Sequence, residues 1–218
     1  MRTLGALVSL GILAAVATGR TEVRFVDSVV AEVEGFVVAA SDVALARALG
    51  LFGLAPAAEP LSAAEVERYA DGRLLVREAT RIGVEVTDAD RVAAWDAVAA
   101  RAGGETALAA WLAAADIDAA RARRMVDDDL SRRRFVDLRF RALAFVSEAE
   151  LSAALGAGAH SEAEREAARA RLEEETARHR LAEWLSEARA RGVVHRLTGE
   201  SSQVPDPLPV PPGAGIHR

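Results

Sequence analysis

The pattern of apolar and polar positions predicts two short strands near the start of the chain and helices along most of the rest. Residues 29–38 are rich in valine and are interrupted at Glu34-Gly35. Glycine can take the positive φ that a two-residue hairpin turn requires. Ser41 and Asp42 are both good N-cap residues, and the apolar positions after them have helical spacing. This stretch therefore predicts a β-hairpin followed directly by a helix.

Between residues 61 and 191 the pattern predicts helices separated by glycine and proline breaks. Three helices begin with a capping box, in which a serine and a glutamate three residues later satisfy each other's backbone N–H groups. The three pairs are Ser62 with Glu65, Ser147 with Glu150, and Ser161 with Glu164. Thr87 is expected to cap a further helix, and either Asp116 or Asp118 caps a long segment that runs to about Phe145.

The last helix is followed by a short apolar stretch, residues 193–197, that predicts a strand. A lone hairpin is marginal in water, so the opening hairpin and this strand each need a partner. We therefore expect a mainly α fold with a small antiparallel β element (α+β), in which the N-terminal hairpin pairs with the C-terminal strand and the helices surround it. Residues 198–218 are rich in proline and glycine and are expected to form a disordered tail.

The first 17 residues have the layout of a secretory signal peptide, with one arginine, an uncharged apolar run and a small-x-small motif that ends at Ala17. The run is short for a membrane span. An uncleaved anchor or an unstructured tail is the alternative. We expect a periplasmic protein without an integral membrane span after cleavage, organised as a signal peptide (1–17), a linker (18–26) and one folded domain (27–197).

Composition narrows the function classes. Only ten of the 218 residues are aromatic, so the core is expected to consist mainly of Leu, Val and Ala, which favours helices. The 27 basic residues are all arginine and are outnumbered by 33 acidic ones, and a net charge of −6 argues against a nucleic-acid-binding protein. The absence of cysteine excludes disulfides and thiol chemistry, and is compatible with the periplasm.

Catalytic chemistry is not expected. The four histidines, at positions 160, 179, 195 and 217, fall in a loop, a helix, a strand and the tail, and no two have the spacing of a metal site. His179 lies between two arginines and is expected to be solvated. No serine has the context of a nucleophile elbow. We expect neither an enzyme nor a cofactor or metal site.

Four large aromatic residues are the candidates for binding another polypeptide: Tyr69, Trp95, Trp111 and Trp184. They either line a hydrophobic cleft for extended polypeptide or anchor the core between helices, and we expect at least two of them to belong to the core.

The charge run Asp127–Asp129 followed by Arg132–Arg134 has two interpretations. At helical spacing it gives acid-to-base pairs, among them Asp128 with Arg132. It forms either the polar rim of a binding groove or an exposed, salt-bridged helix face.

Two stretches carry a resemblance to a known family. Residues 30–43, VAEVEGFVVAASDV, follow the pattern V-A-x-V-N-G-x-x-I-x-x-S-D-V, and residues 72–88, GRLLVREATRIGVEVTD, follow L-L-x-x-E-A-x-x-x-G-I-x-V-(S/T)-D in part. Both patterns, and a closing helix and strand over residues 184–197, resemble the SurA-type periplasmic chaperones across about residues 27–197. Glu34 replaces the usual asparagine. The parvulin-like isomerase domain of that family has no room between Val146 and His160.

The resemblance implies an exported, ATP-independent chaperone that binds unfolded or partly folded envelope proteins, such as outer-membrane proteins, without prolyl isomerase activity. Binding would use apolar helix surfaces and an exposed sheet edge. The alternative is a structural or assembly adaptor that serves one envelope partner.

Overall fold

The computed structural model describes residues 27–33, 35–158, 160–191, 194–196 and 208–213. The expected signal peptide and linker, residues 1–26, lie outside this part of the chain, as does His217.

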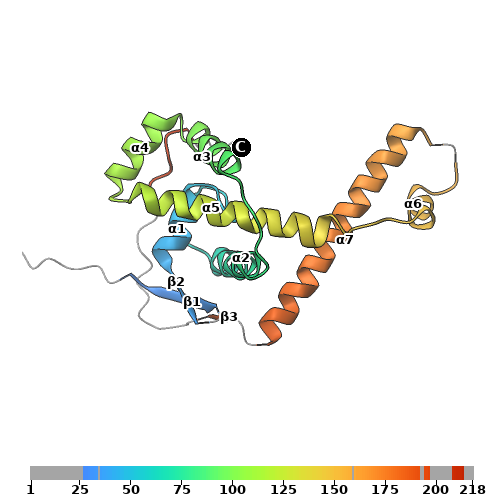
Figure 1. Ribbon diagram of the computed structural model, residues 1–218, viewed down its shortest axis with the longest axis horizontal. Coiled ribbons are helices and arrows are strands. Elements are labelled where there is room, and N and C mark those ends of the chain that lie inside the picture. Colours follow the sequence, from blue (N-terminus) through green and yellow to red (C-terminus); the bar gives the residue numbers. More distant parts are fainter. Residues whose placement is uncertain (1–26, 34, 159, 192–193, 197–207, 214–218) are drawn as a thin grey trace, which may run out of the picture.

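The described part of the chain is mainly helical with a small antiparallel sheet, which confirms the predicted fold class (Figure 1). The strands are β1 (Val29–Val33), β2 (Phe36–Ala39) and β3 (Val194–Arg196). The helices are α1 (Ala40–Ala48), α2 (Ala63–Arg81), α3 (Asp88–Arg101), α4 (Glu105–Ala114), α5 (Ala119–Val136), the π-helical turn η1 (Asp137–Arg141), α6 (Glu148–Leu155) and α7 (Glu162–Ala190).

The sheet has the strand order β2-β1-β3. β1 and β2 form the predicted hairpin, in which Val33 pairs with Phe36 and Gly35 has a φ of +80°. The register is irregular between Val29 and Ala31. The backbone of β1 also pairs with that of β3, with Ala31 opposite Arg196.

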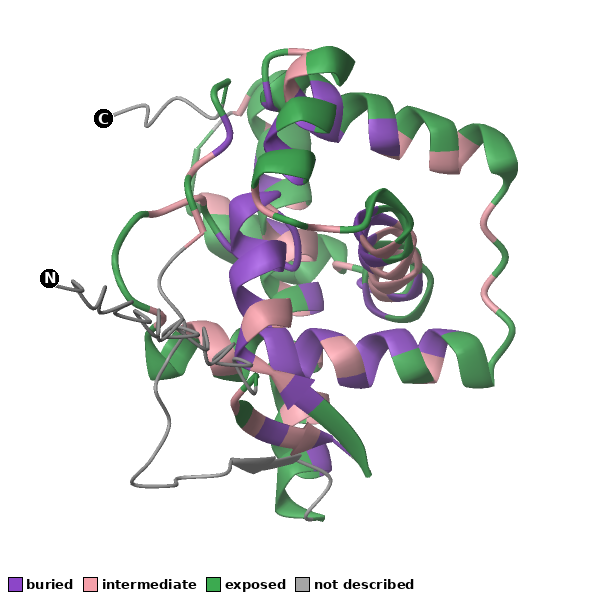
Figure 2. Cartoon of the chain, turned by 90° about the vertical axis from the view of Figure 1, so that its left-hand side faces the viewer, coloured by how far each residue is buried: buried purple, intermediate pink, exposed green. Residues whose placement is uncertain are grey.

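Helix α1 is the centre of the body, since every residue from Val43 to Leu49 is buried (Figure 2). The hairpin, α2, α3, α4 and α5 contribute to the same core cluster. One charged side chain is part of this interior: Arg47 is 2% exposed, and its Nη1 lies 3.4 Å from Oε1 of Glu65 on α2. The helix is therefore held by apolar contacts and by ion pairs to α2 and α5.

Phe52, in the loop after α1, connects α1, α2 and α5. It has a φ of +56°, and its backbone N–H donates a 3.0 Å hydrogen bond to Oδ1 of the buried Asp129 on α5. Its ring lies 4.8 Å from the ring of Tyr69 and directly over Gly72, both on α2. The glycine leaves the space that the ring occupies.

Helix α7 belongs to two regions of the molecule. Its C-terminal half packs on the body, where Arg189 Nε donates a 3.0 Å hydrogen bond to Asp71 of α2. Its N-terminal half projects from the body together with α6 (Figure 1), and we call this projection the arm. A second core cluster fills the junction, with Phe135, Phe140 and Trp184 in mutual aromatic contact.

The predicted helix starts are confirmed at the three serine capping boxes. Thr87 also caps its helix, and Asp90 completes a fourth box that the pattern had not suggested. Asp118, rather than Asp116, caps α5. These caps depend only on residues within one turn, which is why the sequence predicts them.

The prediction that Ser41 or Asp42 caps the first helix is wrong. Helix α1 begins at Ala40 with Ala39 at the N-cap position, and no side chain caps it. Ser41 Oγ instead donates to Asp27 and accepts a 2.8 Å hydrogen bond from Arg121 of α5. Asp42 accepts a 2.6 Å hydrogen bond from the same arginine. Both polar side chains therefore form hydrogen bonds to residues that lie far away in the sequence.

Candidate functional site

Residues 208–213, Leu-Pro-Val-Pro-Pro-Gly, lie against the body near α4 (Figure 1, dark red), and we call them the tail segment. The indole Nε1 of Trp111 donates a 2.7 Å hydrogen bond to the carbonyl oxygen of Pro209. Leu208 packs against the main core cluster, and Pro211 is buried. Disorder was expected for this stretch of the chain, but these six residues have a defined position.

Gly213 lies against the backbone of the body with no room for a side chain. A Cβ atom at this position would lie 2.2 Å from the backbone nitrogen of Gly103 and 2.6 Å from the carbonyl carbon of Ala102. Gly103 and Gly104 form the turn from α3 to α4, with φ values of +91° and +109°. Because the opposing atoms are backbone, the tail segment fits here only with a glycine at position 213.

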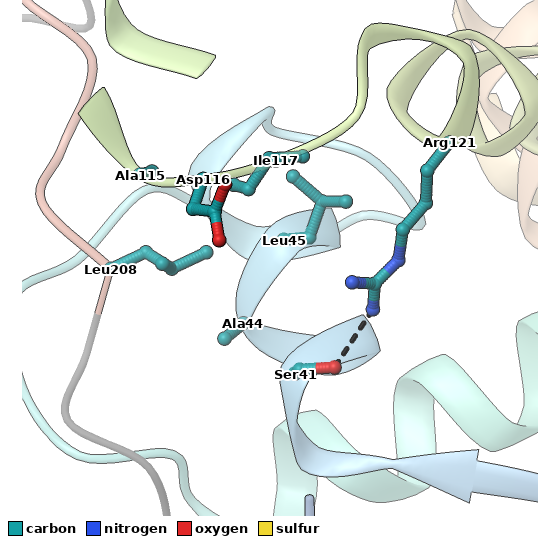
Figure 3. A pocket seen from close by; sticks show the side chains of 8 residues that line it. All are labelled: Ser41, Ala44, Leu45, Ala115, Asp116, Ile117, Arg121 and Leu208. Atoms are coloured by element: carbon teal, nitrogen blue, oxygen red, sulfur yellow. Dashed lines mark hydrogen bonds between the residues drawn. The ribbon is translucent and has the colours of Figure 1, made fainter. Parts of the chain in front are cut away.

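A cavity of about 140 Å³ lies beside the tail segment (Figure 3). Leu208 forms one wall of it, and α1 and the loop between α4 and α5 form the others. The lining residues are Ser41, Ala44, Leu45, Ala115, Asp116, Ile117, Arg121 and Leu208. The cavity is therefore apolar on the side of Leu208 and Leu45, and polar on the side of Ser41 and Arg121.

The side chains of the polar wall hydrogen-bond with one another and with Asp27 and Asp42. The guanidinium of Arg121 donates to both Ser41 and Asp42, at 2.8 and 2.6 Å. The hydroxyl of Ser41 donates in turn to the carboxylate of Asp27. This wall presents a hydrogen-bonded polar network to the cavity.

The tail segment suits this surface because of its own composition. Proline fixes φ and lacks a backbone N–H, so a proline-rich stretch is extended and offers mainly carbonyl oxygens. An indole N–H is a donor without acceptor capacity, and when buried it usually finds such a partner. Trp111 and Pro209 satisfy each other in this way.

The four aromatic residues predicted to bind clients do not share one surface. Tyr69, Trp95 and Trp111 are 2%, 7% and 7% exposed and belong to the main core cluster, and burial raises the pKa of Tyr69. The guanidinium of Arg123 lies 4.1 Å from the ring centre of Trp95. Trp184 is half-buried between the two core clusters. Among the four, Trp111 contacts the tail segment, through its hydrogen bond to Pro209.

A second apolar surface lies where the body meets the arm. Leu138, Leu143 and Phe145 are 53%, 46% and 78% exposed, and they fall within eight consecutive residues. The backbone carbonyl of Leu143 accepts a 2.5 Å hydrogen bond from Arg180 in the C-terminal half of α7, which ties this stretch to that helix. We call these three residues the junction surface.

The charge run on α5 is not simply an exposed helix face. Asp129 is 4% exposed and accepts hydrogen bonds from Phe52 and Arg132. Asp128 pairs with Arg73 of α2 rather than with Arg132 as expected. The run joins α5 to its neighbours.

Nothing in the described residues suggests metal or acid–base chemistry. No group of three or more His, Asp or Glu in that part of the chain could hold a metal ion. His179 is 74% exposed and lies 3.2 Å from Glu183, which confirms that it is solvated. No helix among the described residues is long and apolar enough to cross a membrane.

Sequence reasoning missed the tail segment. Its composition predicted disorder, yet the run Leu-Pro-Val-Pro-Pro has the pattern of peptides that dock on aromatic-lined grooves.

Comparisons of the chain with protein-family models, curated proteins and solved structures found no match.

Proposed function

We propose that this protein is an ATP-independent chaperone of the cell envelope that binds unfolded or partly folded polypeptides and has no isomerase activity. The observation that carries the proposal is the junction surface. Three large apolar side chains are left exposed beside a projecting arm, and one of them, Phe145, is 78% exposed. Exposed apolar side chains that are close together are typical of surfaces that bind other proteins.

Two further features support the proposal. Strand β2 is an edge strand, and its residues Phe36 and Val37 are 46% and 52% exposed, so an extended client could add to the sheet there. The order of elements also resembles SurA-type chaperones. The excess of acidic residues favours solubility of a protein that exposes apolar groups.

The test is suppression of the aggregation of an unfolded outer-membrane protein, measured by light scattering. We expect suppression at near-stoichiometric ratio by the wild type and a several-fold weaker effect for Phe145→Ser. Val92→Ser is the matched control, because Val92 is 60% exposed on α3, away from the junction stretch in the sequence. No suppression by the wild type at several-fold excess would refute the proposal, and an equal loss in both variants would refute the role of the junction surface.

A pull-down from envelope extract separates the chaperone from the alternative of an assembly adaptor. A broad set of unfolded proteins is expected. A single stoichiometric partner would instead identify an adaptor dedicated to that partner.

A further inference from the structure

We propose that the surface under the tail segment is a binding site for extended, proline-containing apolar polypeptide, and that the tail segment occupies it as a competing ligand in the same chain. The inference deepens the proposed function, and rests on it for the source of the natural ligand, an unfolded envelope polypeptide. The occupant seen in the structure defines the chemistry of the ligand.

The contacts to the body are spaced along the tail segment. Leu208 packs against the main core cluster, and Pro209 accepts a 2.7 Å hydrogen bond from Trp111. Pro211 is buried, and Gly213 lies on the α3–α4 turn. Proline-rich segments dock in aromatic-lined grooves, where their preformed polyproline II conformation lowers the entropic cost of binding.

Two positions of the ligand determine which sequences fit the site. At the position of Gly213 a side chain would collide with backbone atoms 2.2 Å away, so the site requires glycine there. At the position of Leu208 the cavity of about 140 Å³ leaves room for a larger apolar side chain. For comparison, an apolar cavity of roughly 150 Å³ holds a benzene molecule. We infer that a ligand with phenylalanine in place of this leucine binds more tightly.

The tail segment occupies the site readily because it is part of the same chain. Residues 197–207 join it to β3 in the sequence. A ligand joined by a short linker has an effective concentration in the millimolar range. A separate polypeptide must compete with this local concentration, so the tail segment sets a threshold for client binding.

The test uses the full protein and a fluorescent peptide with the sequence Leu-Pro-Val-Pro-Pro-Gly, followed by anisotropy. In Gly213→Ala the tail segment cannot occupy the site but the body is unchanged. We expect this variant to bind the peptide with at least a tenfold lower Kd than the wild type. Pro212→Ala is the matched control, because Pro212 is exposed, and it should behave as the wild type.

Three further measurements identify the site. The peptide with alanine in place of its glycine should not bind Gly213→Ala, whereas the glycine peptide binds the same protein, so the contrast does not arise from misfolding of the variant. The peptide with phenylalanine in place of leucine should bind more tightly. Adding Trp111→Phe to Gly213→Ala should weaken peptide binding at least tenfold, with the far-UV circular dichroism unchanged.

Equal peptide affinity of the wild type and Gly213→Ala would overturn the inference. So would a wild-type dimer that Gly213→Ala abolishes, because the site would then belong to the tail of a second copy. Peptide binding without any suppression of aggregation would refute the proposed function alone. Suppression of aggregation without peptide binding would refute this inference alone.

Discussion

Gly72 gives the sharpest test of how α2 packs. Replacing a glycine in a helix interior by alanine ordinarily stabilises a protein by about 0.5–1 kcal/mol, because alanine loses less conformational entropy on folding. In this protein a Cβ atom at Gly72 would lie 2.3 Å from Cδ1 of Phe52. Such a distance is far inside the optimal carbon–carbon separation of roughly 3.5–4.0 Å. The substitution therefore adds a collision to the gain in helix propensity.

The ring of Phe52 cannot move away freely. It is 2% exposed, and it packs 4.8 Å from the ring of Tyr69. Its backbone is held at a φ of +56° and by the hydrogen bond to Asp129. Overpacking a well-filled core costs about 1–3 kcal/mol, and so short a contact belongs at the upper end. After the gain in propensity, we expect Gly72→Ala to lower the free energy of unfolding by about 2 kcal/mol.

Urea titration followed by circular dichroism at the helix band measures this change. The decisive control is the same substitution in a Phe52→Ala background, where the ring is absent. There Gly72→Ala should stabilise the protein by up to about 1 kcal/mol, so the sign of the effect reverses. A stabilising effect in the wild type, or the same effect in both backgrounds, would refute the packing argument.

Three other substitutions test the polar contacts. Asp129→Asn removes the charge that holds a buried backbone N–H and two guanidinium groups, and should cost about 2 kcal/mol in urea unfolding. Burial raises the pKa of Glu65, but the hydrogen bonds from Ser62 and the charge of Arg47 outweigh it and leave this pKa below its ordinary 4.5. The stability that Glu65 contributes is present above about pH 4.5 and is lost as the pH falls through the folded pKa. Glu65→Gln should therefore reduce the loss of unfolding free energy between about pH 5 and lower pH. An unchanged pH dependence in this range would contradict the prediction. Arg189→Leu should speed amide hydrogen exchange in the C-terminal half of α7 and leave the exchange of α6 unchanged. Equal exchange of this half-helix in the wild type and in Arg189→Leu would contradict the prediction.

The sequence predicted those parts of the fold that depend on neighbouring residues. Capping boxes such as Ser62 with Glu65 close within one turn, and the turn of the hairpin needs only Gly35. Ser41 has the same local preference for a helix start, yet its partners are Asp27 and Arg121. Long-range pairing therefore overrode local preference where α1 enters the core.

The candidate site depends on contacts between residues far apart in the sequence, which composition does not indicate. Trp111 was a candidate, but its significance lies in the carbonyl of Pro209, about a hundred residues further along the chain. Gly213 is one of several glycines in a proline-rich stretch, and only its distance to the α3–α4 turn distinguishes it. Exposure of Phe145 likewise follows from how α5 ends rather than from its own sequence neighbours.

The π-helical turn at Asp137–Arg141 has an evolutionary consequence. Its backbone makes an i→i+5 bond, from the N–H of Ala142 to the carbonyl of Asp137 at 2.8 Å, so it contains one residue more than an α-helical turn would accommodate. Deleting a single residue there would restore the α-helix and rotate everything after it by about 100° around the axis. Phe140 would leave the second core cluster, and Phe145 would face another direction. One codon, inserted or lost, thus decides which side chains this junction presents to solvent.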